Sequence, residues 1–275
     1  MIHENVSREA VASHYDELDH FYRDVWGEHV HHGLWLRGAE SREEAVLNLV
    51  ALIAREAQIT SGTRVIDIGC GYGATARVLA SRSADVTGIT ISPAQFAFAQ
   101  SNSSTAKFIL GDWLENNLPN DSFDAAIAIE SSEHMPDIKR FFAEANRVLR
   151  RDGRLVVTAW LSADAPSKRQ QRWLLEPVCR EGRMPNMGTV ADYESLGENA
   201  GFKLERSQDI TQNVARTWPA IVRRFIAKLA TNPHYLRFIL SRHAKNRVFA
   251  LTIFRIWFAY TTAAMRYGVF TFVKS

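Results

Sequence analysis

Apolar and polar positions alternate along the chain so that helices and strands are predicted in turn from about residue 42 onward. Residues 42–57 repeat apolar positions every three to four residues, the period of an amphipathic helix. The short apolar runs of strand length that follow are 63–69, 85–91, 106–112, 123–130 and 153–160, and the helical patterns between them are 74–82, 93–101 and 138–150. This alternation predicts an α/β fold, a mostly parallel sheet with helices on both faces.

The pattern is less regular towards the C-terminus. Residues 202–211 and 267–275 resemble strands, but about 55 mostly helical residues separate them. We interpret residues 1–41 as a helical lid, 42–210 as the core, 211–266 as an inserted helical cap and 267–275 as the last strand of the core.

One helix start is marked by its own residues. Ser92, Pro93 and Gln95 place an N-cap serine, a proline at the first helical position and a glutamine at the third. This spacing is a capping-box signature and predicts a helix that begins at residue 93.

Composition and targeting features favour a cytoplasmic protein. Cys70 and Cys179 are the only cysteines among 275 residues, too few for a disulfide framework or a four-cysteine zinc site. The start, MIHENVSREA, lacks the basic and apolar pattern of a targeting peptide. The longest apolar run, 248–264, is interrupted by Arg255 and predicts no membrane span.

Charge is distributed unevenly around a net value of +3. Residues 211–275 hold 11 Lys and Arg and no acid, which leaves 22 basic and 30 acidic residues, or −8, in the first 210. A basic, aromatic-rich C-terminal quarter is expected to meet anions: lipid headgroups, a phosphorylated substrate or nucleic acid.

The glycine-rich stretch VIDIGCGYGATARVLA predicts a nucleotide-binding loop. Gly69, Gly71 and Gly73 lie between a predicted strand and a predicted helix, where backbone must approach a ligand closely. With Ala74, the loop also satisfies the dinucleotide pattern of NAD-dependent oxidoreductases. That pattern expects an acid about 20 residues on, where this chain has Thr90.

Two acids favour S-adenosylmethionine over NAD. Asp67, just before the first glycine, can meet an ammonium group, which NAD lacks. Asp112 can accept from an adenine amino group, and Trp113 beside it can stack on the ring.

Taken together, these motifs resemble the class I S-adenosylmethionine-dependent methyltransferases, in the branch with tocopherol, sterol and cyclopropane fatty-acid methyltransferases. The closest likeness is to tocopherol O-methyltransferase-like proteins. It rests on DIGCGYG (67–73), GITISPAQ (88–95), GDW (111–113), ESSEHMPD (130–137), YDELDHFYRDVWGEHVHHGLW (15–35), ADYESL (191–196) and VARTWPAIVR (214–223).

The resemblance implies a Rossmann-like, seven-stranded, mostly parallel sheet and a site for S-adenosylmethionine, without a metal. Its cofactor residues would be Tyr15, Trp35, Asp67, Gly69, Cys70, Gly71, Gly73, Thr90, Ile91, Gln95, Gly111, Asp112, Trp113 and Glu130. Thr90 and Gln95 would face the ribose, and Glu130 would lie beside the methionine moiety.

Candidate catalytic residues follow from the chemistry. A sulfonium methyl is already activated, so the enzyme must align the acceptor and remove a proton from it. His134 and Glu133, at the carboxyl end of a predicted strand, are candidates for this base. The alternative is that the segment only packs the wall of the crevice.

The cap predicts a large apolar acceptor. Its aromatic residues are Trp218, Phe225, Phe238, Phe249, Phe254, Trp257, Phe258 and Tyr260, and its basic residues include Arg223, Arg224, Lys228, Arg237, Arg242, Lys245 and Arg247. We expect Trp218 and Trp257 to line the acceptor pocket, and residues 216–255 to contact an anionic membrane surface. Helix core and a solvated face are the alternatives. No nucleic-acid module is recognisable.

The stretch WGEHVHHGLW, residues 26–35, holds three histidines without the spacing of a helical metal site. We interpret it as the end of the lid. His32, Gly33 and Trp35 would close over the methionine end of the cofactor and one wall of the acceptor pocket, and His32 becomes a third candidate base.

These observations predict methyl transfer to a lipophilic or natural-product molecule such as a prenylated phenol or an isoprenoid. Carbon methylation is favoured because tocopherol methylation occurs on a ring carbon. Methylation of nitrogen or oxygen is the alternative, and a peripheral membrane-binding protein without transfer activity is an alternative of another class.

Overall fold

The computed structural model describes the chain except residues 104, 234, 236 and 238–248. Side chains are not described at 249–251 either, so the predictions for Phe238, Arg242, Lys245, Arg247 and the Phe249 side chain fall outside the described residues.

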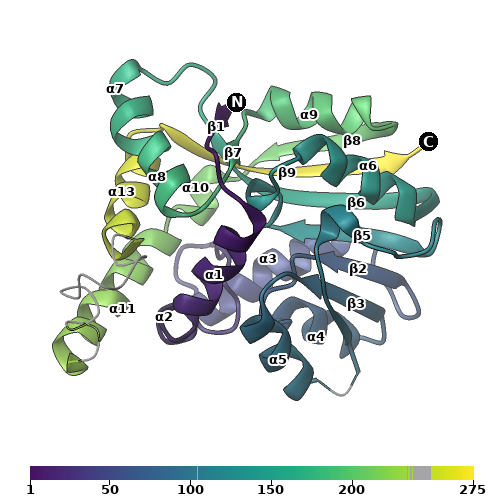
Figure 1. Ribbon diagram of the computed structural model, residues 1–275, viewed down its shortest axis with the longest axis horizontal. Coiled ribbons are helices and arrows are strands. Elements are labelled where there is room, and N and C mark those ends of the chain that lie inside the picture. Colours follow the sequence, from purple (N-terminus) through teal and green to yellow (C-terminus); the bar gives the residue numbers. More distant parts are fainter. Residues whose placement is uncertain (104, 234, 236, 238–248) are drawn as a thin grey trace.

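A seven-stranded sheet forms the centre of the molecule, in the order β4-β3-β2-β5-β6-β9-β8 (Figure 1). The strands are β2 (Arg64–Ile68), β3 (Asp85–Thr90), β4 (Lys107–Leu110), β5 (Phe123–Ile129), β6 (Leu149–Ser162), β8 (Phe202–Asp209) and β9 (Met265–Lys274). Only β9 runs antiparallel to its neighbours. The predicted mostly parallel Rossmann-like sheet is confirmed.

Helices cover both faces because successive strand residues point to opposite sides. Val65 of β2 packs in a cluster with Leu49 and Leu79, from α3 (Arg42–Glu56) and α4 (Ala74–Ala80). Ile66, the next residue, packs on the other face with Phe142 of α6 (Ile138–Val148). The same side carries α9 (Val190–Asn199), while α5 (Pro93–Ser101) packs beside β4. Both faces are apolar, as a parallel sheet requires.

The start of α5 differs in one respect from its sequence signature. Ser92 caps the helix by accepting from the Gln95 N–H at 3.2 Å. The Gln95 side chain does not complete the box; its Oε1 accepts from the Thr90 hydroxyl at 2.9 Å instead. The capping box is therefore half formed, because Gln95 lines a cavity at the end of β3.

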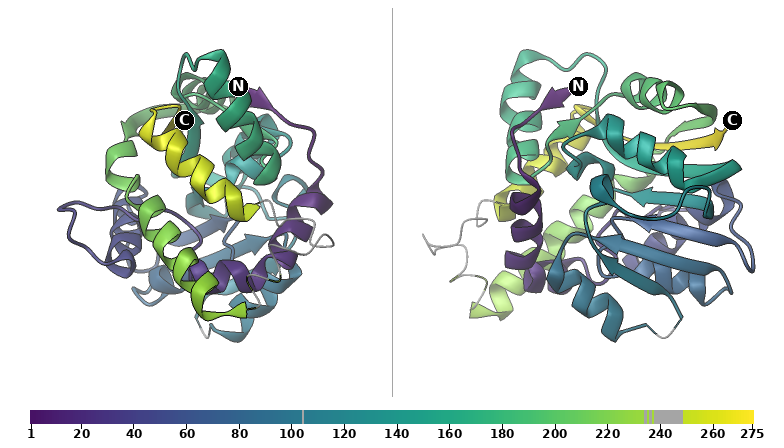
Figure 2. Two further views of the ribbon diagram at one scale, coloured as in Figure 1. Left: turned by 90° about the vertical axis from the view of Figure 1, so that its left-hand side faces the viewer. Right: turned by 45° about the vertical axis from the view of Figure 1, so that its right-hand side comes forward.

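The N-terminal segment crosses the carboxyl end of the sheet (Figures 1 and 2). Its first strand, β1 (Ile2–His3), pairs antiparallel with β7 (Asn186–Met187), and α1 (Arg8–Glu17) and α2 (Asp19–Val25) follow. Arg8 contacts Asp112 at 2.5 Å, and Asp16 accepts from the Ser92 hydroxyl at 2.6 Å. Both ends of α1 are thus fastened to loops of the core.

The cap contains more of the chain than the insertion predicted from sequence. Between β8 and β9 lie α10 (Thr211–Val214), α11 (Thr217–Thr231) and α13 (Phe249–Thr261). They are joined by α7 (Lys168–Gln170), the single π-helical turn η3 (Gln171–Leu175) and α8 (Glu176–Glu181), which connect β6 to β7. Of these three, η3 and α8 pack against α13. The last strand begins at Met265, two residues earlier than expected. None of the described helices combines the length and apolar character needed to cross a bilayer.

Candidate functional site

Three cavities meet where the parallel strands end. Gly69 follows β2, Thr90 ends β3, Gly111 follows β4 and Glu130 follows β5. Carboxyl ends of parallel strands open at one edge of the sheet, which is where such folds bind ligands. All four residues line the first cavity.

The first cavity gathers most of the predicted cofactor residues, namely Tyr15, Gly69, Gly71, Thr90, Ile91, Gln95, Gly111, Asp112, Trp113 and Glu130. Arg8 and Val11 of α1 form its outer wall, which sequence reasoning missed. Arg8 pairs with Asp112, and the other oxygen of Asp112 accepts from the Leu114 N–H at 2.8 Å. Trp113 is buried and its indole donates to the Phe141 carbonyl at 3.2 Å, which fixes the ring.

The third cavity lies beside the glycine loop and contains a buried carboxylate. It is lined by Asp67, Gly69, Cys70, Gly71 and by His29 and His31 of the lid. Asp67 is 2% exposed, and its Oδ2 has no hydrogen-bond partner. Burial raises the pKa of Asp67 to about 7. A carboxylate left unpaired in this way fits a cationic ligand such as an ammonium group.

The second cavity extends from the first towards the cap. Its walls are largely apolar and aromatic and include Tyr22, Trp26, Trp160, Val178, Met184 and Ile256. Four residues line both cavities: Tyr15, Val30, Glu130 and His134. A group bound in the first cavity can therefore meet one bound in the second only at these side chains.

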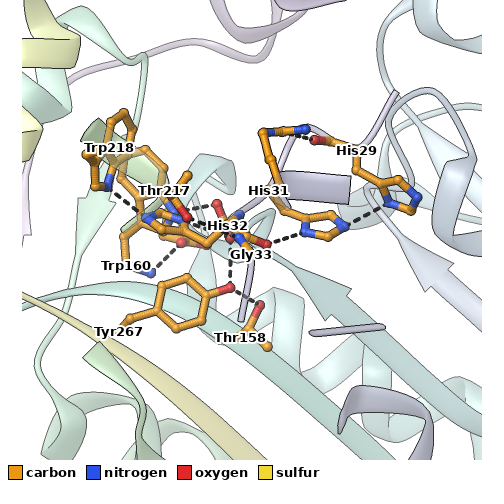
Figure 3. A network of polar contacts seen from close by, with 12 residues as sticks. His29, His31, His32, Gly33, Thr158, Trp160, Thr217, Trp218 and Tyr267 are labelled. Carbon is orange, nitrogen blue, oxygen red and sulfur yellow. Dashed lines mark hydrogen bonds and ion pairs between the residues drawn. The ribbon is translucent and has the colours of Figure 1, made fainter. Parts of the chain in front are cut away.

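Glu130 is held by donors from three parts of the chain, namely His32, Trp160 and Tyr267, which are labelled in Figure 3. One carboxylate oxygen accepts from the His32 N–H at 2.7 Å, from His32 Nδ1 at 3.0 Å and from the Tyr267 hydroxyl at 2.7 Å. The other accepts from the Trp160 indole at 2.6 Å. Burial alone would raise the pKa of Glu130, but the donors around it outweigh burial and hold that pKa well below its ordinary value. Glu130 is therefore a carboxylate.

The His32 side chain connects Glu130 to the cap through hydrogen bonds at both of its ring nitrogens. The Trp218 indole donates to His32 Nε2 at 2.9 Å, so that nitrogen is an acceptor and Nδ1 carries the proton given to Glu130. Both ring nitrogens are engaged in a side chain that is 1% exposed. His32 also lies outside the lining of all three cavities. In this geometry neither ring nitrogen of His32 is open to an acceptor, so its role as a base stays a prediction that these contacts do not favour.

The other two histidines form a directed chain. The His32 carbonyl can only accept, so His31 Nδ1 donates to it at 2.7 Å, and His29 Nδ1 donates to His31 Nε2 at 3.0 Å. Burial lowers the pKa of both rings and keeps them neutral. Across the described residues, no three His, Cys, Asp or Glu side chains converge on a metal position.

His134 and Tyr15 form a hydrogen-bonded pair at the junction of the first two cavities. The Arg183 carbonyl accepts from His134 Nδ1 at 3.1 Å, so Nε2 faces the Tyr15 hydroxyl, 2.9 Å away, as an acceptor. Burial lowers the pKa of His134 and raises that of Tyr15. The pair is neutral, and the free lone pairs of the Tyr15 oxygen lie where a donor in the second cavity can reach them.

Glu133 lies deeper in the second cavity. Its Oε1 accepts from the Trp160 N–H at 2.6 Å, and the Ser132 hydroxyl lies 3.0 Å from Oε2. Burial, opposed by these hydrogen bonds, raises the pKa of Glu133 to about 8. At neutral pH it is mostly a carboxylic acid.

Several predicted pocket residues have other roles. Trp35 is buried and donates its indole N–H to the Glu40 carbonyl at 3.1 Å, and Trp218 is buried against His32. Trp257 is 38% exposed on the outside of α13. None of these tryptophans lines the three cavities. They are core or surface because the lid packs directly on the cap and leaves the second cavity between α2, α8 and β6.

Gly73 and Gly33 serve packing. A side chain at Gly73, which has φ +72°, would meet the Phe108 ring at 2.5 Å. A side chain at Gly33 would meet Ala45 at 2.7 Å. The lid contributes Glu28, His29, Val30 and His31 to the wall of the third cavity, whereas His32, Gly33 and Trp35, which were expected to close over the cofactor, do not line it.

Comparison with known proteins identifies relatives along most of the chain. The family model described as mycolic acid cyclopropane synthetase matches residues 3–264. A chloroplastic tocopherol O-methyltransferase of Arabidopsis thaliana is 31% identical over 240 residues, 78% of this chain and 69% of the relative. The 27-O-demethylrifamycin SV methyltransferase of Amycolatopsis mediterranei is 32% identical over 227 residues, 78% of this chain and 81% of the relative.

Among solved structures, the [4+2]-cyclase SpnF superposes with a TM-score of 0.84 at 24% identity and covers 98% of this chain and 96% of its own. A likeness at that identity shows the fold alone. Because that neighbour is described as a cyclase, the fold does not by itself fix the reaction.

The role of His32 predicts a large loss of stability when it is removed. His32→Ala leaves the Trp218 indole unpaired and removes the Nδ1–H donor from a buried carboxylate while the backbone N–H donor stays, so the free energy of unfolding should fall by about 3 kcal/mol. His29→Ala, at the partly exposed end of the histidine chain, should cost about 1 kcal/mol or less. Urea unfolding of both variants measures the difference. Equal losses would contradict the network as described.

Proposed function

The chain belongs to the mycolic acid cyclopropane synthetase family and is an S-adenosylmethionine-dependent methyltransferase, and we propose that it methylates a lipophilic small molecule held in the second cavity. The observation that carries the proposal is the junction at Tyr15, Val30, Glu130 and His134, where a cofactor-sized cavity opens into an apolar one. When bound, S-adenosylmethionine supplies an activated methyl group.

We assign the three parts of the cofactor to the cavities by chemistry. Asp67, with its unpaired Oδ2, would hold the amino group, and Gly69 and Gly71 leave room for the amino-acid end. Thr90 and Gln95, already bonded to each other, would face the ribose. Asp112 and Trp113 would hold adenine, with Arg8 closing over them.

The acceptor is inferred from the walls of the second cavity. Tyr22, Trp26, Val178, Met184 and Ile256 offer little beyond apolar contact, which suits a prenyl, polyketide or isoprenoid skeleton. A hydroxyl of the acceptor could donate to Tyr15. Tyr15 would pass its own proton to His134 Nε2 and take the proton of the acceptor as the acceptor attacks the methyl carbon, so that the cofactor would leave as a neutral thioether and the positive charge would end on His134.

Carbon is our preferred acceptor atom, on the phenolic chemistry implied by the tocopherol-type resemblance. A phenol that gives its proton to Tyr15 gains electron density on its ring carbons as well as its oxygen, so the same residues would serve methylation of oxygen. After methylation of carbon, that ring carbon would lose its hydrogen as a proton, and the phenol oxygen would regain a proton from the Tyr15–His134 pair. Methylation of nitrogen would need only the neutral His134 and Tyr15.

The direct test is incubation with methyl-labelled S-adenosylmethionine and matched acceptors. A phenol bearing a long prenyl chain should be methylated well, and the same phenol without its chain at least about tenfold less efficiently, because burying each methylene contributes about 0.8 kcal/mol. The labelled position, read by nuclear magnetic resonance, distinguishes carbon from oxygen. Equal turnover of the chain-free phenol would contradict a lipophilic acceptor.

Asp67→Asn should weaken S-adenosylmethionine binding by about 10- to 100-fold, the effect of losing a charge-assisted hydrogen bond. In the parent, affinity should rise with pH through about 7, because the Asp67 carboxyl must lose its proton to pair with the ammonium. Calorimetry at several pH values measures both effects. Asp164→Asn, at an exposed carboxylate, is the control.

The same substitution should stabilise the ligand-free protein. The pKa of the Asp67 carboxyl is higher in the folded than in the unfolded protein, so the free energy of unfolding falls as pH rises from the unfolded pKa to the folded one. Above about pH 7 Asp67 is ionised and this loss of stability is complete. Asp67→Asn should therefore unfold at a higher temperature than the parent at pH 8. A lower unfolding temperature, or pH-independent binding in the parent, would contradict the assignment.

Tyr15→Phe and His134→Gln should each lower kcat by about 100-fold or more, with S-adenosylmethionine affinity within about threefold of the parent. Because burial lowers the pKa of His134, the acid limb of the kcat profile should lie below the ordinary histidine value. Glu133→Gln should leave the position of that limb unchanged. A limb near pH 8 that disappears in Glu133→Gln would show that Glu133 is the base instead.

A further inference from the structure

The outward side of α13 exposes aromatic side chains at helical spacing. Phe254, Trp257 and Phe258 are 38%, 38% and 58% exposed, and positions separated by three and four residues lie on one face of a helix. In Figure 2, left, α13 lies in yellow between α11 below and the helices α7 to α8 above. The aromatic face is thus framed by cap helices.

The framing helices continue this surface. Trp173 of η3 is 65% exposed and Ile226 of α11 is 52% exposed. In the part of the chain that the structure describes, every exposed Trp and Phe lies on these helices, whereas the other exposed large apolar residues, Met1, Leu36, Leu47 and Leu110, belong to other parts of the fold. We call Trp173, Ile226, Phe254, Trp257 and Phe258 the outer cap face. Clustering of this kind marks an interaction surface.

Basic side chains border the outer cap face. Lys168, Arg169 and Arg172 are exposed on α7 and η3, and the Arg172 guanidinium lies 5.4 Å from the centre of the Trp173 ring. Arg223 is exposed on α11. The sequences of α11 and α13 contain no acid. The border therefore attracts anions.

Three basic residues of the cap that were expected on this surface contact the N-terminal part of the chain instead. Arg224 lies 3.4 Å from Glu43, Lys228 lies 3.7 Å from Asp24, and Arg216 donates to the Gly38 carbonyl at 2.5 Å. These three cations fasten the cap to the N-terminal part of the chain. Glu181, at the end of α8, accepts hydrogen bonds from Arg255 and Thr252 of α13.

The same helices wall the acceptor cavity on their inner side. Ile256 of α13, Val178 of α8 and Gly182 line the second cavity. Ile256 lies on the buried side of α13, whereas Phe254 and Trp257 lie on its exposed side. The helix therefore faces the acceptor cavity on one side and the exterior with its aromatic side chains on the other.

We propose that the outer cap face docks on an anionic lipid bilayer, with its indole and phenyl rings at headgroup level and Arg169, Arg172 and Arg223 on lipid phosphates. Exposed Trp and Phe bordered by Arg and Lys is the composition that binds at lipid interfaces. That the acceptor is then drawn from the bilayer rests on the proposed function, whereas docking itself does not.

The test is cosedimentation of the full chain with vesicles of phosphatidylcholine, with and without phosphatidylglycerol. The parent should bind the anionic vesicles. Trp257→Ser with Phe258→Ser should lower the partition coefficient at least about tenfold, because apolar area entering the interface is lost. Leu47→Ser with Leu110→Ser, which removes exposed apolar side chains outside the cap, should leave it unchanged. Arg169→Gln with Arg172→Gln should weaken binding to anionic vesicles only.

Calorimetry with S-adenosylmethionine confirms that each variant is folded and separates docking from transfer. Vesicle binding without methyl transfer would count against the proposed function alone. Docking is overturned if the parent does not bind the vesicles, or if binding depends on charge but is unaffected by loss of Trp257 and Phe258. It is also overturned if those substitutions abolish a dimer seen by sedimentation while vesicle binding is absent, since the face would then meet a second copy.

Discussion

The arrangement of lid, core and cap depends on a single buried carboxylate. Glu130 follows β5 at φ +52°, a left-handed conformation that costs a residue with a side chain about 1–3 kcal/mol. It is stable there because four donors meet it: two from His32 in the lid, the Trp160 indole from β6 and the Tyr267 hydroxyl from β9. A buried carboxylate without such donors would be far too costly to keep ionised.

This constraint also fixes the cap. The only described partner of His32 Nε2 is the Trp218 indole of α11, so the cap helix is positioned by the same network that orients Glu130. Nearby, the Gly33 N–H donates to the Thr217 hydroxyl at 3.1 Å, and the Asn213 amide donates to the Trp35 carbonyl at 3.0 Å. The lid and the cap therefore pack as one layer over the sheet, and the cavity that remains between them lies beside Tyr15 and His134.

Most of the sheet could be predicted from sequence because β2 to β6 and β9 each contain a short apolar run and the helices between the parallel strands show apolar positions at helical spacing. The cofactor cavity was also largely predictable, since Gly69, Thr90, Gly111 and Glu130 all follow or end strands, and strand ends converge in a parallel sheet. Contacts across the lid were not. The spacing of the histidines in the lid did not indicate that the ring nitrogens of His31 and His32 would form hydrogen bonds with a carbonyl, a carboxylate and an indole. Nor did residues 168–181 carry a pattern that placed them over α13. The second cavity depends on those contacts, which explains why Trp35, Trp218 and Trp257, expected in the acceptor pocket, do not line it.

The proposed chemistry requires that the first and third cavities together hold one cofactor molecule, with its reactive end at the junction with the second cavity. A structure with bound S-adenosylhomocysteine tests it most directly. We predict the amino group within hydrogen-bond distance of Asp67, adenine between Trp113 and the Arg8 side of the lid, and the sulfur beside Tyr15, Glu130 and His134, facing the second cavity. A sulfur atom directed away from that cavity, or an amino group far from Asp67, would contradict it.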